Sequence, residues 1–582
     1  MQILTATERN KVGISDNSTQ SVILNRLGEA QAASIHQSIA EKIESRNEPD
    51  AIALLEHWQG AGNRPKAADS ALKGARQANE KLAFDLEAEL YYKALELRQR
   101  GVQDWRLMVS RAAALANSNR GVEAGETYNS AVAAAESCGE TETLGLRAEA
   151  SRQLLCAGAV EPGIETLRDM LDTANLKWPR TVVHAAADIG LNRAANAFTN
   201  LTGLSLSPQV VTRDIVDSCW AAIMGLNSVD AVRSASFEAK RSRLANKLGD
   251  PIRNVRALAS EAMFRTAEGG STAIAGSEKE LQHAHKLAKQ SNDKYAMAFV
   301  ELSSGVSAYF ACQWSQAVSR LGNELESFEQ LNGVAWEISN CRLWRLSALY
   351  WSGDLTGLLA EQEATLRRAL VEDNVNFKLA ANSGHGNFVR ILRNKVELAV
   401  TECESAVDPF RGDSFTSPYY AELVTRMHID LYQGNPVAAY IRFSDLQPTL
   451  LRSGLLRLGI FGVEANLLGA NASISLAQQG HSTPQSIRSA KQAIKRLYKS
   501  SLPITQPLAA ILNLLLEQST GTTNRQASSH LLKHAEKMED LNFNLLAWAT
   551  RMAANTDSDL PSQNSVNAGN LSGALLPSPH FI

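Results

Sequence analysis

Apolar residues recur along this chain at the three- and four-residue spacing of an α-helix. The stretch AFDLEAELYYKALELRQR (83–100) places Leu86, Leu90 and Ala94 on one stripe, with charged residues opposite. Residues 324–351 repeat this pattern on both sides of a glycine. Such a stripe is typical of an amphipathic helix that needs a neighbour to cover it. Strand-like alternation is hard to find, so the pattern predicts an all-α protein.

The turns between the helical stretches follow a shared pattern. Each stretch ends on large apolar residues, passes a small or polar residue and reaches a glycine, which suits the left-handed position just past a helix end. The examples are HWQGAGNRPKAA (57–68), LLCAGAVEPGIETL (154–167), ALYWSGDLTGLL (348–359) and DLYQGNPVAAYI (430–441). YFACQWSQAVSRL (309–321) has the same form without glycine. Repeated turns of this kind predict an α-solenoid of tetratricopeptide-like antiparallel helix pairs.

The spacing of these turns is irregular, and no strict period of about 34 residues is visible. Gly353 and Gly434 lie 81 residues apart, which predicts a degenerate turn between them. Small residues mark the closest helix contact within residues 57–78, namely Ala67, Ala68, Ala71, Gly74 and Ala75. No catalytic motif accompanies them, which favours a scaffold.

Prolines and polar segments divide the 582 residues into predicted parts. The NLTGLSLSPQVVTR stretch (200–213) indicates a break between two helical arrays, and QQGHSTPQSI (478–487) sets off a last group of helices. The predicted parts are a disordered tail at 1–20, a first helical-repeat array at 21–200, a linker at 201–212, a second array at 213–478, C-terminal helices at 479–554, and a disordered Ser/Asn/Pro-rich tail at 555–582.

Net charge and cysteine distribution limit the classes of partner and the cellular compartment that we expect. Lys and Arg number 58 against 61 Asp and Glu, for a net charge of −3, so no electrostatic footprint for nucleic acid or an anionic membrane is present. The six cysteines are scattered singly, which favours a reducing compartment. No signal peptide and no run of about 18 apolar residues is visible. We therefore expect a cytoplasmic protein that binds neither nucleic acid nor membrane.

Searches for catalytic and metal-binding motifs identify no catalytic, cofactor-binding or metal-ligating residue. Residues 268–281 (EGGSTAIAGSEKEL) lack phosphate-loop spacing, and we interpret them as an inter-helix loop with Ser277 as the helix cap. No kinase motif or hydrolase elbow occurs. His530 and His534 are one helical turn apart but lack a third ligand, which favours a solvated helix face. His385, between two glycines, is interpreted as a turn residue.

Aromatic residues gather between residues 328 and 351, where they could anchor a partner. Aromatics at helical spacing belong to a core more often than to a binding surface. Arg342 and Trp344 are kept as the candidate partner-binding residues.

Several stretches resemble a bacterial protein family. They include LLEHWQGAGNRPKAADSALKGARQANEKLAFDLEAELYYKALEL, GVAWEISNCRLWRLSALYWSGDL and RGDSFTSPYYAELVTRMHIDLYQGNPVAAYIRF, and they run in the same order over most of residues 30–475. The resemblance is to the C-terminal tetratricopeptide-like region of large multidomain serine/threonine protein kinases, in which a kinase domain and an AAA-type ATPase module precede the helical repeats. The family's phosphate loop, kinase lysine and catalytic aspartate match no residue of this chain.

Two functions remain open at this stage. The first is a non-catalytic module that binds a protein partner or peptide segment, such as a kinase/ATPase module, and serves as the sensor or autoregulatory arm of a signalling kinase system. The alternative is a serine/threonine protein kinase by family membership, with its catalytic domains upstream or on a separate chain. A transcription regulator lacks a DNA-binding helix or basic patch here. No cofactor is expected.

Overall fold

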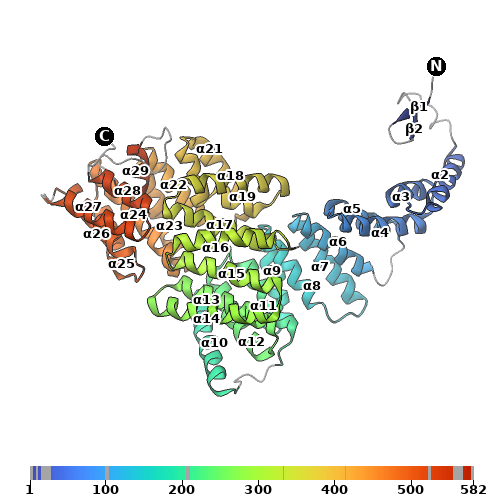
Figure 1. Ribbon diagram of the computed structural model, residues 1–582, viewed down its shortest axis with the longest axis horizontal. Helices are drawn as coiled ribbons and strands as arrows, with labels where there is room; N and C mark the ends of the chain where they lie inside the picture. Colours follow the sequence, from blue (N-terminus) through green and yellow to red (C-terminus); the bar gives the residue numbers. More distant parts are fainter. Residues whose placement is uncertain are drawn as a thin grey trace. The chain divides into compact units, whose positions relative to one another are not determined.

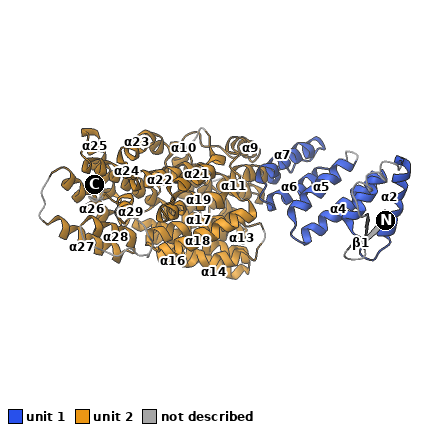
Figure 2. Ribbon diagram, turned by 90° about the horizontal axis from the view of Figure 1, so that it is seen from above, with its two compact units in different colours: residues 1–146 blue, residues 147–582 orange. Residues whose placement is uncertain are grey.

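The computed structural model describes residues 4–7, 11–14, 28–98, 104–204, 210–331, 333–412, 415–521, 526–554 and 568–577. The chain divides into two compact units, residues 1–146 and residues 147–582 (Figure 2). Both units consist mainly of helices, most of which pack against the helices next to them in sequence (Figure 1). The predicted all-α class, with antiparallel helix pairs stacked as in a solenoid, is confirmed.

Unit 1 is a consecutive stack in which each helix packs against the next. Its helices are α2 (Glu29–Glu44), α3 (Ala51–Gly60), α4 (Arg64–Glu80), α5 (Phe84–Leu97), α6 (Asp104–Asn117) and α7 (Gly121–Ser137). Two short strands, β1 (Leu4–Thr7) and β2 (Lys11–Ile14), form an antiparallel hairpin in the stretch where the sequence predicts a disordered tail. The small residues of α4 allow the close approach: Ala67, Ala71 and Ala75 are fully buried.

Unit 2 contains the larger core. Its helices are α8 (Leu144–Cys156, which contains the boundary), α9 (Val160–Thr173), α10 (Val182–Thr202), α11 (Arg213–Leu226), α12 (Ala231–Leu248), α13 (Pro251–Glu268), α14 (Ser271–Ser291), α15 (Lys294–Phe310), α16 (Trp314–Phe328), α17 (Ala335–Ser352), α18 (Leu355–Glu372), α19 (Val375–Asn382), α20 (Gly384–Leu392), α21 (Val396–Val407), α22 (Ser417–Tyr432), α23 (Pro436–Ser453), α24 (Gly459–Gln478), α25 (Pro484–Lys499), α26 (Thr505–Ser519), α27 (Ala527–Asp540), α28 (Asn544–Ala553) and α29 (Ala568–Leu575). Two short 3₁₀ helices, η1 (Asp408–Phe410) and η2 (Leu455–Arg457), precede α22 and α24.

One left-handed residue sets each of the recurring turns. At Asn394 φ is +53°, its N–H donates to the Ile391 carbonyl at 2.9 Å, and the Lys395 N–H donates to the Arg390 carbonyl at 2.8 Å. This pair of bonds satisfies the last carbonyls of a helix and turns the chain. Cys312 occupies the same position with φ of +61° in the stretch that lacks glycine.

Five of the left-handed residues lie at nearly equal intervals, with others such as Gly333 and Asp373 between them. Cys312, Gly353, Asn394, Gly434 and Gly480 are separated by 41, 41, 40 and 46 residues. Asn394 is therefore the degenerate turn predicted between Gly353 and Gly434. Asparagine tolerates the left-handed region better than most residues with a side chain, which is why the repeat continues there without glycine.

The structure differs from the sequence analysis at the domain boundary and the C-terminal tail. The sequence places a break at 201–212, whereas the two compact units meet at residue 146. Helix α8 packs across the expected break, because a Cβ at Gly225 of α11 would lie 2.6 Å from the Leu155 side chain. Within 555–582, residues 568–575 form α29, whose Leu571, Ala574 and Leu575 are almost fully buried. These apolar side chains pack into the core of unit 2, although the residues on either side of the segment are polar.

Two local interpretations are also corrected. Residues 268–281 are mostly helical, because α14 begins at Ser271 directly after Gly269 and Gly270, both with positive φ. Ser277 lies inside that helix and is buried, so it is not the cap. His385 lies in α20 rather than in a turn.

One described helix, α24, is long and apolar enough to cross a membrane by length and composition alone, with a mean hydropathy of 1.2. Of that apolar window, 83% is buried against other helices. A helix at the centre of a large helical core meets the same criteria, so this is weak evidence for a membrane span.

The left-handed turn between α4 and α5 generates a stability prediction. Leu82 has φ of +56° and is 60% exposed, so its side chain adds little packing to offset backbone strain. We expect Leu82→Gly to raise the free energy of unfolding of unit 1 by about 1 kcal/mol. Leu86→Gly, at a 41% exposed position inside α5, should lower it by about the same amount. Amide hydrogen exchange of α4 and α5 measures both changes, and a loss of protection in Leu82→Gly would contradict the prediction.

Candidate functional site

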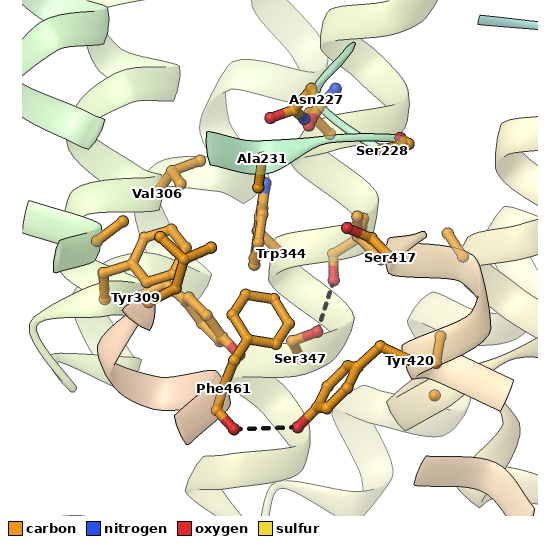
Figure 3. A pocket seen from close by; sticks show the side chains of 18 of the residues that line it. Asn227, Ser228, Ala231, Val306, Tyr309, Trp344, Ser347, Ser417, Tyr420 and Phe461 are labelled. Atoms are coloured by element: carbon orange, nitrogen blue, oxygen red, sulfur yellow. Dashed lines mark hydrogen bonds between the residues drawn. The ribbon is translucent and has the colours of Figure 1, made fainter. Parts of the chain in front are cut away.

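A cavity of about 170 Å³ lies within unit 2 and is the candidate site. Residues from α11, α13, α15, α17, α19, α20, α22 and α24 line it, so segments separated by more than 200 residues contribute to one wall. Figure 3 shows Tyr309, Trp344, Tyr420 and Phe461 around this space. A partly enclosed, mostly apolar cavity with a few converging polar groups is typical of a binding site.

Aromatic rings form much of the wall. Trp344 of α17 lies 5.0 Å from Tyr309 and 5.1 Å from Phe310, measured between ring centroids. Phe461 lies 6.3 Å from Trp344 and 5.2 Å from Tyr420. The rings meet edge-on or tilted, which is the favourable arrangement for aromatic side chains and keeps the wall rigid.

A carboxylate, a histidine and a tyrosine meet at one end of the cavity. Glu464 of α24 accepts a hydrogen bond from His385 Nε2 at 2.6 Å on Oε1 and from the Tyr420 hydroxyl at 2.7 Å on Oε2. The Tyr420 hydroxyl also lies 3.2 Å from the Phe461 carbonyl oxygen (Figure 3). All three side chains line the cavity.

The surroundings keep Glu464 ionised. Burial alone would raise the pKa of this carboxyl, but the charge and hydrogen bond of His385 and the hydrogen bond of Tyr420 hold the pKa below its ordinary value. Burial, together with the charge of Glu464, raises the pKa of Tyr420 well above its ordinary value. Tyr420 therefore remains a hydrogen-bond donor to a carboxylate at neutral pH.

Two glycines position His385 at the start of α20. Gly384 has φ of +53°, and its N–H donates to Thr425 Oγ1 of α22 at 2.8 Å. A Cβ at Gly386 would lie 2.1 Å from the Ala380 carbonyl oxygen, so only glycine fits where α20 turns back on α19. The SGHGN sequence therefore fixes the direction of one histidine.

A further layer of aromatic and histidine side chains supports His385. Tyr350 stacks on its ring with the centroids 4.2 Å apart, and the Tyr350 hydroxyl lies 3.2 Å from His428 Nε2. His428 is buried, and its Nδ1 has no hydrogen-bond partner within the described structure. Burial lowers the pKa of His428 to about 4, so this ring is neutral at physiological pH.

The two candidate residues from the sequence lie in different environments. Trp344 lines the cavity, whereas Arg342 lies outside its wall and is 8% exposed. Arg342 Nη1 lies 2.7 Å from Glu361 Oε1, and Arg345 also pairs with Glu361. Positions two apart on a helix point in nearly opposite directions, which separates the two residues. Arg342 ties α17 to α18 and is not available on a surface.

Sequence analysis missed Glu464 and misplaced His385. The available signal was a single carboxylate in the apolar stretch GIFGVEANLLGANASISLAQ, because an isolated charge in a buried helix needs a partner. His530 and His534 lie on α27, and among the described residues no group of three or more His, Cys, Asp or Glu could hold a metal ion.

Comparisons with known proteins give no family for this chain. No family model matches it, and no curated protein matches it in sequence. Among solved structures, the complex "Structure of Naa15/Naa10 bound to HypK-THB" contains a chain with 12% sequence identity and a TM-score of 0.23, over 92% of this chain and 95% of that one. A TM-score this low does not establish a common arrangement of the helices.

The buried His428 predicts a pH dependence of stability. Its pKa is about 4 in the folded protein and about 6.5 when unfolded, so between these values the unfolded chain binds a proton that the folded chain does not. Stability should therefore fall as the pH falls from 6.5 to 4, by up to about 3 kcal/mol from this residue.

Urea unfolding across that pH range measures the effect. His428→Leu should flatten the pH dependence relative to wild type, while His283→Leu, which removes an exposed histidine of unit 2, controls for the loss of a histidine. Because wild type and variant share every other titrating group, the difference between them isolates His428. Parallel curves for wild type and His428→Leu would exclude this role.

Proposed function

We propose that this chain is a non-catalytic helical-repeat module that binds a protein segment and acts as the regulatory arm of a serine/threonine kinase signalling system in the cytoplasm. Stacked helix pairs present a preformed surface, which lowers the ordering cost of binding and needs no reactive group. The assignment to a kinase system rests on the sequence resemblance over residues 30–475 and goes beyond what the comparisons identify.

The observation that carries the interaction role is a repeated apolar position in unit 1. The second or third residue of every other helix is a large, exposed apolar side chain: Ile52 of α3 (48% exposed), Leu86 of α5 (41%) and Val122 of α7 (39%). Single exposed apolar residues are common, but these three all lie in the first turn of alternate helices, so we infer that they lie along the same edge of the stack. We name these three residues the apolar row.

A peptide that binds along the apolar row would bury these side chains at intervals of one repeat. Apolar anchors separated by polar surface are how solenoids recognise extended or helical segments. The apolar row favours a protein segment, rather than a small molecule, as the ligand of unit 1. A protein segment can cover exposed side chains on an open surface, whereas a small molecule needs an enclosed space.

Affinity capture from the native host tests the row. A protein with a kinase or ATPase module should co-purify with the tagged wild-type chain, and the triple variant Ile52→Ser, Leu86→Ser, Val122→Ser should retain less than about a tenth of it, since each lost anchor weakens binding by roughly 1 kcal/mol. The matched control carries Lys73→Ser, Gln77→Ser and Asn117→Ser at exposed positions of α4 and α6. Equal capture by both triple variants would contradict the row, and capture without any kinase or ATPase protein would contradict the kinase link.

A phosphotransfer assay tests the non-catalytic assignment separately. Purified chain incubated with ATP, Mg²⁺ and a generic phosphoacceptor protein should transfer no phosphate above background, because the kinase lysine and catalytic aspartate match no residue of the sequence. Transfer that co-purifies with the chain through a second chromatography step would establish the alternative, a kinase enzyme.

A further inference from the structure

The cavity of unit 2 is lined by a carboxylate that is paired with a histidine. Among the described residues that line it, Glu464 is the one carboxylate, and no lysine or arginine is present. Glu464 is 5% exposed, so its charge is poorly screened by water. His385 is the one lining group, among the described residues, that can carry a positive charge at neutral pH, and it already pairs with Glu464 Oε1. A cationic ligand would be attracted to the other oxygen of Glu464, whereas an anionic ligand would meet no lysine or arginine among the described lining residues.

Glu464 retains capacity to bind. Each of its oxygens accepts one hydrogen bond, from His385 and from Tyr420. An ionised carboxylate offers about four lone-pair positions, so roughly half remain for a ligand. His385, Tyr420, Tyr350, Tyr309 and His428 are the titratable groups around it, and none of them adds a second carboxylate.

Aromatic faces complete the site. A cation within about 6 Å of an aromatic ring face is stabilised by the ring's negative face, and aromatic walls are the usual receptor for organic ammonium groups. Trp220, another residue that lines the cavity, already makes this interaction within the protein. The Cζ atoms of Arg241 and Arg256 lie 4.5 and 5.0 Å from the centroid of its ring. Nearer Glu464, Trp344, Phe461 and Tyr420 have no such arginine among the described residues.

The volume limits the ligand to about one ring. A cavity of about 150 Å³ with apolar walls accommodates benzene in another protein, and this one measures about 170 Å³. We propose that the cavity binds a small organic cation, with an apolar body against the aromatic wall formed by Trp344 and Phe461 and its positively charged nitrogen at Glu464. This ligand site lies within unit 2 and does not depend on the partner proposed for unit 1.

Three probes of similar shape test the charge requirement on the full chain. Benzyltrimethylammonium carries the cation, neopentylbenzene is its uncharged carbon isostere, and phenylacetate is the anion. Tryptophan fluorescence and calorimetry should show the cation binding at least tenfold more tightly than the isostere, with no binding of phenylacetate. Three results would each overturn the proposal: equal affinity of the cation and the isostere, tighter binding of phenylacetate, or no binding of the cation up to about 10 mM, which corresponds to a binding free energy of about 3 kcal/mol.

The variant Glu464→Gln tests whether Glu464 is the residue that makes the cavity prefer a cation. It removes the negative charge and keeps an oxygen for Tyr420, so the cation should bind about tenfold more weakly while the isostere is unaffected. Unchanged isostere binding also reports that the cavity is intact. Glu326→Gln, at an exposed position of α16, is the matched control and should bind all three probes as wild type does.

A second variant covers the case in which Glu464→Gln does not fold. Trp344→Leu removes an aromatic face but keeps an apolar wall, so it should reduce the preference for the cation over the isostere at least threefold. A preference that survives in either folded variant would overturn the assignment of the cation to this end of the cavity.

Discussion

Burial of one helix's apolar stripe by the next helix is the interaction on which this structure depends. Each helix alone is too short and too polar on its outer face to persist in water. At most of the described turns, a left-handed residue brings the next stripe into position, since it satisfies the last carbonyls and turns the chain back. Helix pairing and turn geometry are therefore one constraint.

The cavity of unit 2 arises where this regular stacking is interrupted. Helices α19 and α20 are only eight and nine residues long, and the turn between them brings His385 toward α24. Large aromatic side chains from α15 and α17 meet at the same place, with their rings tilted to one another rather than stacked. A buried carboxylate is tolerated there because two donors compensate its lost hydration.

Sequence periodicity was sufficient for the helices and for most turns, because both follow from local rules. Gly62, Gly158, Gly353 and Gly434 all occupy the expected left-handed position. The site was less accessible, since the partners of Glu464 lie 79 and 44 residues away in the chain and no local pattern indicates that α20, α22 and α24 converge. Arg342, in contrast, was selected from the sequence as a surface residue because it is charged and lies among aromatic residues. Its buried partner Glu361 could not be identified without the fold.

The position of helix α28 limits how unit 2 could gain or lose repeats. It docks on the turn that ends α17, where Asn544 Nδ2 donates to the Ser352 carbonyl at 2.9 Å and a Cβ at Gly353 would lie 2.7 Å from the Leu545 nitrogen. A linear repeat array can gain or lose a whole repeat, because each repeat touches only its neighbours. Here almost 200 residues separate two surfaces that must meet, so a duplication or deletion between them would displace the closing contact. Because this contact closes a loop of almost 200 residues, we expect it to form late in the folding of unit 2.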